Sequence, residues 1–233
     1  MKVGVMQPYF FPYIGYWQLI NSVDKYIIYD DVNFIKRGWI NRNRILINGI
    51  DKMINIQLKN ISQNKLINEI EVTGDGVYNK KLLKTIESNY SKAPYYSVVF
   101  PIIKDIINQK ETNFALYLEY QIRQICKYLS IETEILVSSS IRKNNKLKGQ
   151  DKIIDICNVL GADEYINAIG GQELYSHEKF NNYDIKLKFL KTGNVEYKQF
   201  KNQFVSNLSI IDVMMFNSQL EIKEILTQLE YIQ

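Results

Sequence analysis

Short apolar runs alternate along this chain with longer stretches in which apolar residues recur every three or four positions. The short runs are typical of buried strands and lie at residues 3–6, 26–29, 133–137, 165–168 and 185–190. Helical spacing occurs at residues 14–22, 79–129 and 151–160, and from 209 to the end of the chain. Strands that alternate with helices in this way predict an α/β fold with a Rossmann-like, mostly parallel sheet flanked by helices.

A turn signal interrupts this alternation early in the chain. Asn48-Gly49 is a favoured hairpin turn and stands between the apolar segments 45–47 and 53–56. The sequence therefore predicts an inserted β-hairpin here. Residues 67–72 are expected to add one further strand.

The helical portion around 79–129 contains Pro94 and Pro101, which are expected to interrupt it because proline cannot continue a helix. No linker rich in proline or serine divides the chain, and no internal repeat is present. We therefore expect a single α/β domain over residues 1–233.

The charge of the chain is nearly balanced, with 29 Lys+Arg against 25 Asp+Glu and a formal net charge of +4. Only five residues are arginine, and three of them (Arg37, Arg42 and Arg44) fall close together. A protein that binds DNA through its backbone normally carries a longer basic face than this. We therefore expect no stable DNA binding, and the arginine cluster favours a small anionic substrate.

The two cysteines, Cys126 and Cys157, lie in apolar helical patterns and are expected to be reduced core thiols. The chain begins with a strand pattern instead of a signal peptide, and it has no run of 18 apolar residues. These features predict a cytoplasmic protein without a membrane span. Two distant cysteines and one histidine lack the spacing of a zinc site, so no metal site is predicted.

Aromatic residues crowd the segment QPYFFPYIGY, which follows the first predicted strand. Ligands of open α/β sheets bind beyond the carboxyl ends of the strands, and loops seldom expose so much apolar surface without a partner. The candidate substrate-binding residues in this segment are Gln7, Tyr9, Tyr13 and Tyr16. The alternative is that Phe10, Phe11 and Trp17 simply pack onto the core.

A second polar segment follows the strand at 26–29. Asp30 and Asp31 are adjacent carboxylates, so joint ionisation is disfavoured and one of them is a candidate catalytic base. The candidate phosphate- and substrate-binding residues that follow are Lys36, Arg37, Trp39, Asn41 and Arg42. Acid, cation and aromatic side chains at this edge fit a phosphorylated or nucleotide-linked substrate. The alternative is an ion-pair network that holds the hairpin.

Three further polar residues are candidates. His177 is the only histidine and a candidate general base, although its polar neighbours are typical of a solvated surface position. Gln199 is a candidate binding amide. Asp212 is read equally well as a functional carboxylate or as a helix-start residue.

Three ordered blocks of the sequence resemble the WbqC-like family. The first is QPYFFPYIGYWQLI at 7–20 with DKYIIYDDVNFIKRGWINRNRI at 24–45. The second is DKIIDIC at 151–157 with LGA at 160–162, Tyr165 and Gly170-Gly171, and the third is YKQ at 197–199 with Phe204 and LSIID at 208–212. The resemblance covers nearly the whole chain.

Genes of this family often lie in O-antigen and other surface-glycan clusters of bacteria. The resemblance implies a transferase that attaches an acyl or aminoacyl group, such as glycine, to the amine of a nucleotide-activated amino-deoxy sugar in lipopolysaccharide biosynthesis. Asp30 or Asp31 would then act as the base, Arg37, Arg42 and Asn41 would hold phosphate, and Tyr9, Tyr13 and Trp39 would form the pocket walls. The donor is left open between acyl-CoA, ATP with an amino acid, and aminoacyl-tRNA, as is the oligomeric state.

A fainter likeness points to nucleotidylyltransferases of the HIGH class. Tyr13-Ile-Gly-Tyr16 stands where these enzymes carry His-x-Gly-His, and SSSIR at 138–142 is similar to their Ser-rich loop. Tyrosines in both histidine positions remove the imidazole donors of that chemistry. The alternatives to acyl transfer are therefore an ATP-using ligase or nucleotidyltransferase-like enzyme on a degenerate frame, and a non-catalytic partner that binds a sugar nucleotide.

Overall fold

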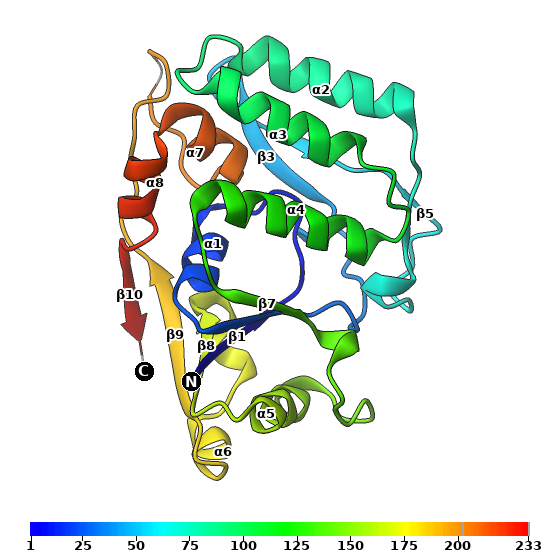
Figure 1. Cartoon of the computed structure of the whole chain (residues 1–233), viewed down its shortest axis with the longest axis vertical. Helices are drawn as coiled ribbons and strands as arrows, with labels where there is room; N and C mark the ends of the chain where they lie inside the picture. The colour runs from blue at the N-terminus through cyan, green and yellow to red at the C-terminus, as the bar shows by residue number, and fades with distance from the viewer. Residues whose placement is uncertain (202, 233) are drawn as a thin grey trace.

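A six-stranded sheet forms the centre of the protein in a computed structural model that describes residues 1–201 and 203–232 (Figure 1). The strands are β1 (Lys2–Met6), β2 (Lys25–Ile28), β7 (Glu134–Val137), β8 (Glu164–Ala168), β9 (Lys186–Thr192) and β10 (Leu229–Ile232). Their order is β10-β9-β8-β1-β2-β7, with β10 antiparallel to β9 and all other pairs parallel. The five parallel strands thus have the Rossmann order, which reverses between β1 and β8. The predicted fold class is confirmed.

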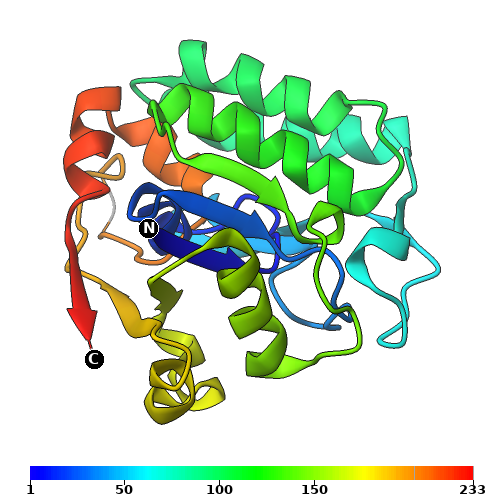
Figure 2. The same cartoon turned by 60° about the horizontal axis from the view of Figure 1, so that its bottom comes forward.

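Helices cover both faces of this sheet (Figure 2). Side chains alternate between the faces, so Tyr26 and Ile28 of β2 enter the larger apolar cluster while Ile27 enters the smaller one. The helices on the first face include α1 (Ile14–Asn21), α4 (Phe114–Leu129), α7 (Ile210–Phe216) and α8 (Gln219–Ile225). The second face carries α5 (Gly149–Leu160), η3 (Ile169–Leu174) and α6 (His177–Asn181).

The predicted helical portion consists of α2 (Gly76–Tyr90), α3 (Tyr96–Asn108) and α4, stacked over the first face. The break expected at Pro94 is present, but the break expected at Pro101 is wrong because Pro101 lies inside α3. Its missing N–H leaves the carbonyl of Ser97 without a helical partner. Both residues are exposed, so water can satisfy that carbonyl.

The inserted hairpin is confirmed as β3 (Arg42–Ile47) paired with β4 (Ile50–Asn55). Asn48 and Gly49 have φ values of 52° and 80°, as a type I′ turn requires. The further strand expected over 67–72 is mostly wrong, because a 3₁₀ turn, η1 (Ile67–Glu69), replaces its first half. The Glu69 carboxylate accepts a hydrogen bond from the Leu66 amide (2.8 Å) and caps this turn locally. Only β6 (Glu71–Val72) is extended, paired with β5 (Leu58–Lys59).

The C-terminal segment was expected to be mostly helical, and α7 and α8 confirm this as far as residue 225. The last element is instead the strand β10, which the helical reading missed. Its four residues are too few to carry a clear period, and they pair with β9, which would otherwise be an open sheet edge. No helix in the described part of the chain is long and apolar enough to cross a membrane.

Candidate functional site

The candidate site lies beyond the carboxyl ends of β2 and β7. β2 leads into Tyr29, Asp30 and Asp31, and β7 leads into a short 3₁₀ turn, η2 (Ser138–Ser140). The helix α5 then begins at Gly149, and no side chain caps its first turn. Parallel pairing of β2 with β7 brings these segments to one edge. A helix start with free backbone N–H groups attracts anions.

Asp30 is buried and fully engaged by the protein. Its carboxylate accepts hydrogen bonds from the Ser139 amide (2.9 Å), the Ser139 hydroxyl (2.6 Å) and the Asn68 side-chain amide (3.0 Å). These bonds tie η2 and η1 to the end of β2. This environment favours a structural role for Asp30 over a catalytic one.

Asp31 lies between two lysines whose side chains are almost fully buried. Its Oδ2 is 2.8 Å from Lys143 Nζ and 3.0 Å from Lys152 Nζ, and the three side chains are 11%, 0% and 7% exposed respectively. Lys152 also donates to the Asp31 carbonyl (2.9 Å) and stands 5.1 Å from the centre of the Tyr29 ring. Lys143 also donates to the Ser138 carbonyl. The cluster carries one net positive charge.

The electrostatics keep Asp31 ionised. Burial alone would raise the pKa of the carboxyl, but Lys143 and Lys152 outweigh it, and the pKa lies below its usual value. Asp31 Oδ1 is buried with no hydrogen-bond partner of its own in residues 1–201 and 203–232. Buried charges cost free energy unless they are fully paired, so such a cluster marks a functional site more readily than a stabilising one.

A cavity of about 650 Å³ opens beside this cluster. It is lined by Tyr29, Asp31, Val32, Asn33, Leu66, Asn68, Ser139, Asn145, Leu147, Lys148, Gly149 and Lys152. We call it the Asp31 cavity. Two lysines, the uncapped start of α5 and several amides face a single carboxylate, so the cavity suits an anionic ligand that also carries hydrogen-bond donors.

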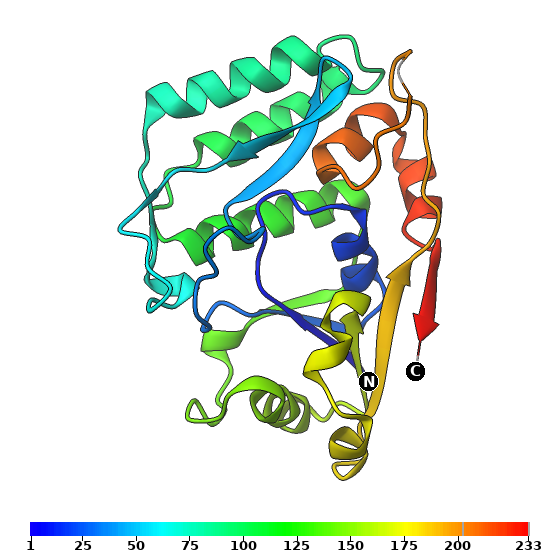
Figure 3. The same ribbon diagram turned by 180° about the vertical axis from the view of Figure 1, so that it is seen from behind.

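Three of the predicted wall residues lie together elsewhere along the same edge. Tyr9, Tyr13 and Trp39 line a second cavity of about 260 Å³ with Pro12, Asn43, Arg44 and Asn207. We call it the aromatic cavity. The dark-blue loop after β1 reaches the hairpin strand β3 at this point (Figure 3). The sequence thus grouped these three residues as the structure does.

The predicted phosphate-binding residues lie in neither of these cavities. Lys36, Arg37, Asn41 and Arg42 line a separate hollow of about 450 Å³ beside the hairpin. The Arg42 guanidinium donates to the carbonyls of Gly38 (2.9 Å) and Arg37 and so holds the preceding loop. The structure therefore places Asp31, the three ring residues and these basic-segment residues in three different hollows.

Several other candidates occupy internal positions. Tyr16 is buried in the core and donates to the Gln7 carbonyl (3.2 Å). Gln199 is buried and donates to Asp212 (2.7 Å), which also accepts hydrogen bonds from Tyr90 and Tyr197. Burial raises the pKa of Asp212 although these three donors lower it. This network favours a structural role for Gln199.

The remaining reactive side chains lie away from the Asp31 cavity. His177 begins α6, and its ring packs edge-on against Phe189 with the centroids 5.9 Å apart. Burial raises the pKa of Cys126 and of Cys157 to about 12, so both are inert core thiols as expected. Among the described residues, no group of three or more His, Cys, Asp and Glu side chains is placed to hold a metal ion.

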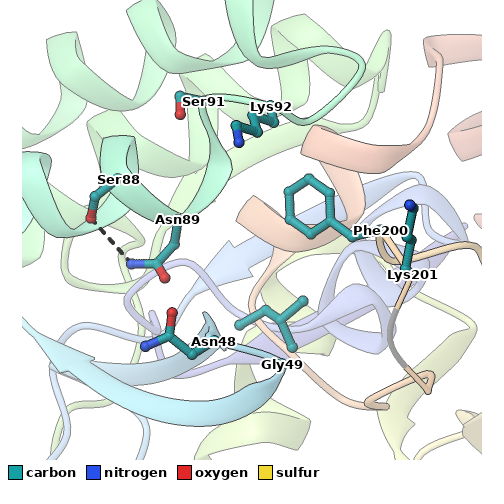
Figure 4. Close-up of a pocket in the computed structure, with 9 residues that line it drawn as sticks. Asn48, Gly49, Ser88, Asn89, Ser91, Lys92, Phe200 and Lys201 are labelled. Carbon is teal, nitrogen blue, oxygen red and sulfur yellow. Dashed lines mark hydrogen bonds between the residues drawn. The ribbon is translucent and has the colours of Figure 1, made fainter.

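A further hollow of about 500 Å³ lies between the end of α2, the β3–β4 turn and the loop at Phe200 (Figure 4). Lys92 and Lys201 stand on different sides of it, and Asn48 of the β3–β4 turn and Asn89 of α2 both line it. It lies outside the carboxyl edge of the sheet and contains no ion pair among the described residues. We therefore place the candidate site at the Asp31 cavity.

The sequence did not single out the two lysines that define this site. Lys152 stands within the block DKIIDIC, but helical lysines are usually solvated, so a lysine at this position does not indicate a buried site residue. Lys143 directly follows the Ser-rich segment SSSIR, and that position was the one available hint. Their common partner, Asp31, was among the predicted catalytic residues.

The fold and site define the class as a doubly wound α/β protein with a charged cavity at the carboxyl edge of its sheet. The chain belongs to the WbqC-like protein family, whose model matches residues 7–224. It is similar to the uncharacterized protein Rv1507c of Mycobacterium tuberculosis (strain ATCC 25618 / H37Rv), with 29% identity over 220 residues that span 93% of each chain. No solved structure matches the chain.

Proposed function

We propose that this protein is a transferase that places an acyl or aminoacyl group on the amine of a nucleotide-linked amino-deoxy sugar, in surface-glycan biosynthesis. The observation that supports this proposal is the buried Asp31–Lys143–Lys152 cluster beside the Asp31 cavity. The family resemblance supplies the substrate class, and the cluster supplies chemistry that this class requires.

The net positive charge of the cluster serves the attacking amine. A sugar amine attacks only when it is neutral, and nearby ammonium groups lower the pKa of an amine because they disfavour a second positive charge. Lys143 and Lys152 therefore favour the neutral form in the cavity. The Asp31 carboxylate accepts a hydrogen bond from the amine and orients its lone pair. Its low pKa makes it an orienting group more than a strong base.

The same lysines serve the acyl carbonyl. As the C–N bond forms, negative charge develops on the carbonyl oxygen, and Lys152 stands in the cavity wall as a donor to that oxygen. The bond from the acyl carbon to the donor group then breaks. The proton lost by the amine leaves with the departing group, so the reaction is balanced without an oxidant or a metal.

The start of α5 serves the phosphates. Its first turn lacks a side-chain cap, and Lys148 and Gly149 line the cavity. Backbone N–H groups at a helix start bind phosphate oxygens, and Lys148 adds a charge. This replaces the predicted role of Arg42, whose guanidinium is occupied by the loop carbonyls.

The test is a product assay. The protein is incubated with dTDP-linked amino sugars and, in turn, acyl-CoA, ATP with amino acids, and aminoacyl-tRNA, and the amide is sought by mass spectrometry. We expect product with one donor class and its loss in Asp31→Asn and Lys152→Met. Lys25→Met is the matched control, because Lys25 pairs with Glu134 (3.2 Å) at the opposite end of β2. Absence of product with all three donor classes overturns the proposal.

A second candidate is an ATP-using ligase. The observation that favours it is that Ser139 of the Ser-rich turn and the start of α5 both border the Asp31 cavity, as a triphosphate site would need. Release of pyrophosphate in the presence of ATP and an acid substrate distinguishes it. Amide formation from acyl-CoA without pyrophosphate excludes it.

A further inference from the structure

The aromatic cavity is lined by three aromatic rings and one arginine, whose guanidinium carbon lies 5.6 Å from the centre of the Trp39 ring. Tyr9, Tyr13 and Trp39 contribute the rings, Arg44 contributes the charge, and no carboxylate is among the described residues that line it. Trp39 is 43% exposed, so part of its ring is open to a ligand in this cavity. At about 260 Å³ the cavity is smaller than sites for drug-sized ligands, so it takes a single ring system.

The loop that carries the two tyrosines is held in place from several directions. Gln121 of α4 accepts from the Phe11 amide and donates to the Tyr9 carbonyl, both at 3.0 Å. Asn43 and Ser209 each donate to the Phe11 carbonyl at 2.8 Å. Phe11 itself has a φ of 43°, a conformation that these contacts maintain. The rings are therefore positioned before any ligand arrives, which lowers the entropy cost of binding.

Arg44, one of the residues that line this cavity, carries a donor without a partner among the described residues. Its Nη1 pairs with Asp51 Oδ2 (3.0 Å), and the guanidinium carbon lies 5.6 Å from the centre of the Trp39 ring. Its Nε is buried and has no hydrogen-bond partner among residues 1–201 and 203–232. A buried donor without an acceptor costs free energy that a ligand atom can recover.

We propose that the aromatic cavity binds a nucleobase, with its ring stacked on Trp39 and the tyrosines and a ring carbonyl or ring nitrogen accepting from Arg44. Bases stack on aromatic side chains because every base has a flat π-face. A sugar ring is not flat and presents hydroxyls that need several polar partners, and this cavity offers few. A phosphate fits less well, because the charge of Arg44 is already balanced by Asp51.

This assignment rests on the proposed function in one respect, because the base would be that of the nucleotide-linked sugar. Binding of free nucleotides, without any transfer, tests it separately. The fluorescence of Trp39 is titrated with UMP, TMP, CMP, AMP and GMP, and with ribose 5-phosphate as the probe that lacks a base. We expect at least one nucleotide to quench Trp39 and ribose 5-phosphate to leave it unchanged.

Two variants distinguish the contribution of the Arg44 donor to nucleotide binding from that of its ion pair with Asp51. Arg44→Met removes the donor and should weaken nucleotide binding about tenfold. Asp51→Asn breaks the same ion pair but keeps the donor, so binding should stay within about twofold. Tyr13→Leu tests the ring face independently, and circular dichroism checks that each variant is folded.

Equal binding of ribose 5-phosphate and the nucleotides overturns the site, as does an equal effect of Arg44→Met and Asp51→Asn. The two proposals fail in different ways. Nucleotide binding without amide formation contradicts the transferase and leaves the base site standing. Amide formation that Tyr13→Leu and Arg44→Met leave unaltered contradicts the base site alone.

Discussion

The Asp31 cavity and the aromatic cavity lie along the same edge of the sheet but are lined by side chains of different chemical character. The first holds a buried carboxylate and two buried ammonium groups, and the second holds ring faces around one arginine. Buried charges are expensive and are retained where they act on a reacting group, whereas rings provide area without a desolvation cost. This contrast is the reason for proposing chemistry at the first cavity and recognition at the second.

The largest expected effect is that of Asp31→Asn. The change leaves Lys143 and Lys152 facing each other without an anion, and breaking a buried ion pair in this way costs about 3–5 kcal/mol. We expect urea denaturation to show a loss of that order and the product assay to show no turnover. Asp31→Asn with Lys143→Met removes one of the repelling charges and should recover part of the stability. A loss below about 1 kcal/mol in the single variant would contradict a buried cluster.

The next effect concerns inorganic pyrophosphate as a probe of the Asp31 cavity. Lys152→Met should weaken pyrophosphate binding by about tenfold or more, because it removes a charge-assisted donor. Lys148→Met should weaken it about twofold, since Lys148 is exposed and its charge is screened. Calorimetric titration measures both, and Lys92→Met at the hollow of Figure 4 is the control. Nucleotide quenching of Trp39 that falls in parallel would show that the cavities are not independent.

A smaller effect is the pH dependence of stability, which should differ in sign between two carboxylates. The pKa of Asp31 is lowered in the folded protein, so its contribution is present above the unfolded value near 3.8 and is lost as the pH falls below it. The pKa of Asp212, which is buried in α7, is raised by burial. The contribution of Asp212 to stability is greatest below the unfolded-state pKa near 3.8 and declines as the pH rises. Unfolding of Asp31→Asn and Asp212→Asn from pH 3 to 7, compared with the wild type, measures both slopes, and equal signs would contradict them.

The smallest effect is that of Trp39→Phe on stability. The side chain is 43% exposed and makes no hydrogen bond through its ring among the described residues, so the change should stay within about 0.5 kcal/mol. The buried Trp17, which donates to the Pro12 carbonyl (3.0 Å), remains as the fluorescent reporter of unfolding. Nucleotide-induced quenching should disappear in this variant. Quenching that persists would move the ligand from the aromatic cavity to the surroundings of Trp17.

The fold could be predicted wherever a pattern had local causes. The apolar runs gave the parallel strands, and Asn48-Gly49 gave the hairpin, because both signals lie within a few residues. β10 was missed because its strand character comes from pairing with β9, which lies about forty residues earlier. A helix break was expected at Pro101 because the sequence alone does not show that the Ser97 carbonyl, which loses its helical partner there, is exposed to water.

The candidate site shows the same limit more sharply. Tyr9, Tyr13 and Trp39 were grouped as pocket walls and do line one cavity, because the Phe10 amide donates to the Ile40 carbonyl (3.0 Å) and joins their two segments. Asp30 and Asp31 are adjacent residues of the same type, and the sequence does not distinguish their roles. Asp30 accepts hydrogen bonds from Ser139 and Asn68, whereas Asp31 pairs with two lysines. That difference depends on Lys143 and Lys152, more than a hundred residues away, and on the direction in which each carboxylate leaves the chain. The assignments to individual site residues therefore stay predictions until the variants are measured.

Gln121 has a consequence for the order in which the protein assembles. Its single amide completes the loop at Phe11 from a distance of 110 residues, and Ser209 does so from 198. Contacts so far apart in sequence carry a high loop-closure cost, and they require the intervening chain to be in place. The aromatic cavity therefore exists only once α4 and α7 have docked. A base that occupies it would stabilise the whole folded state against unfolding, rather than one loop, and would slow global amide hydrogen exchange.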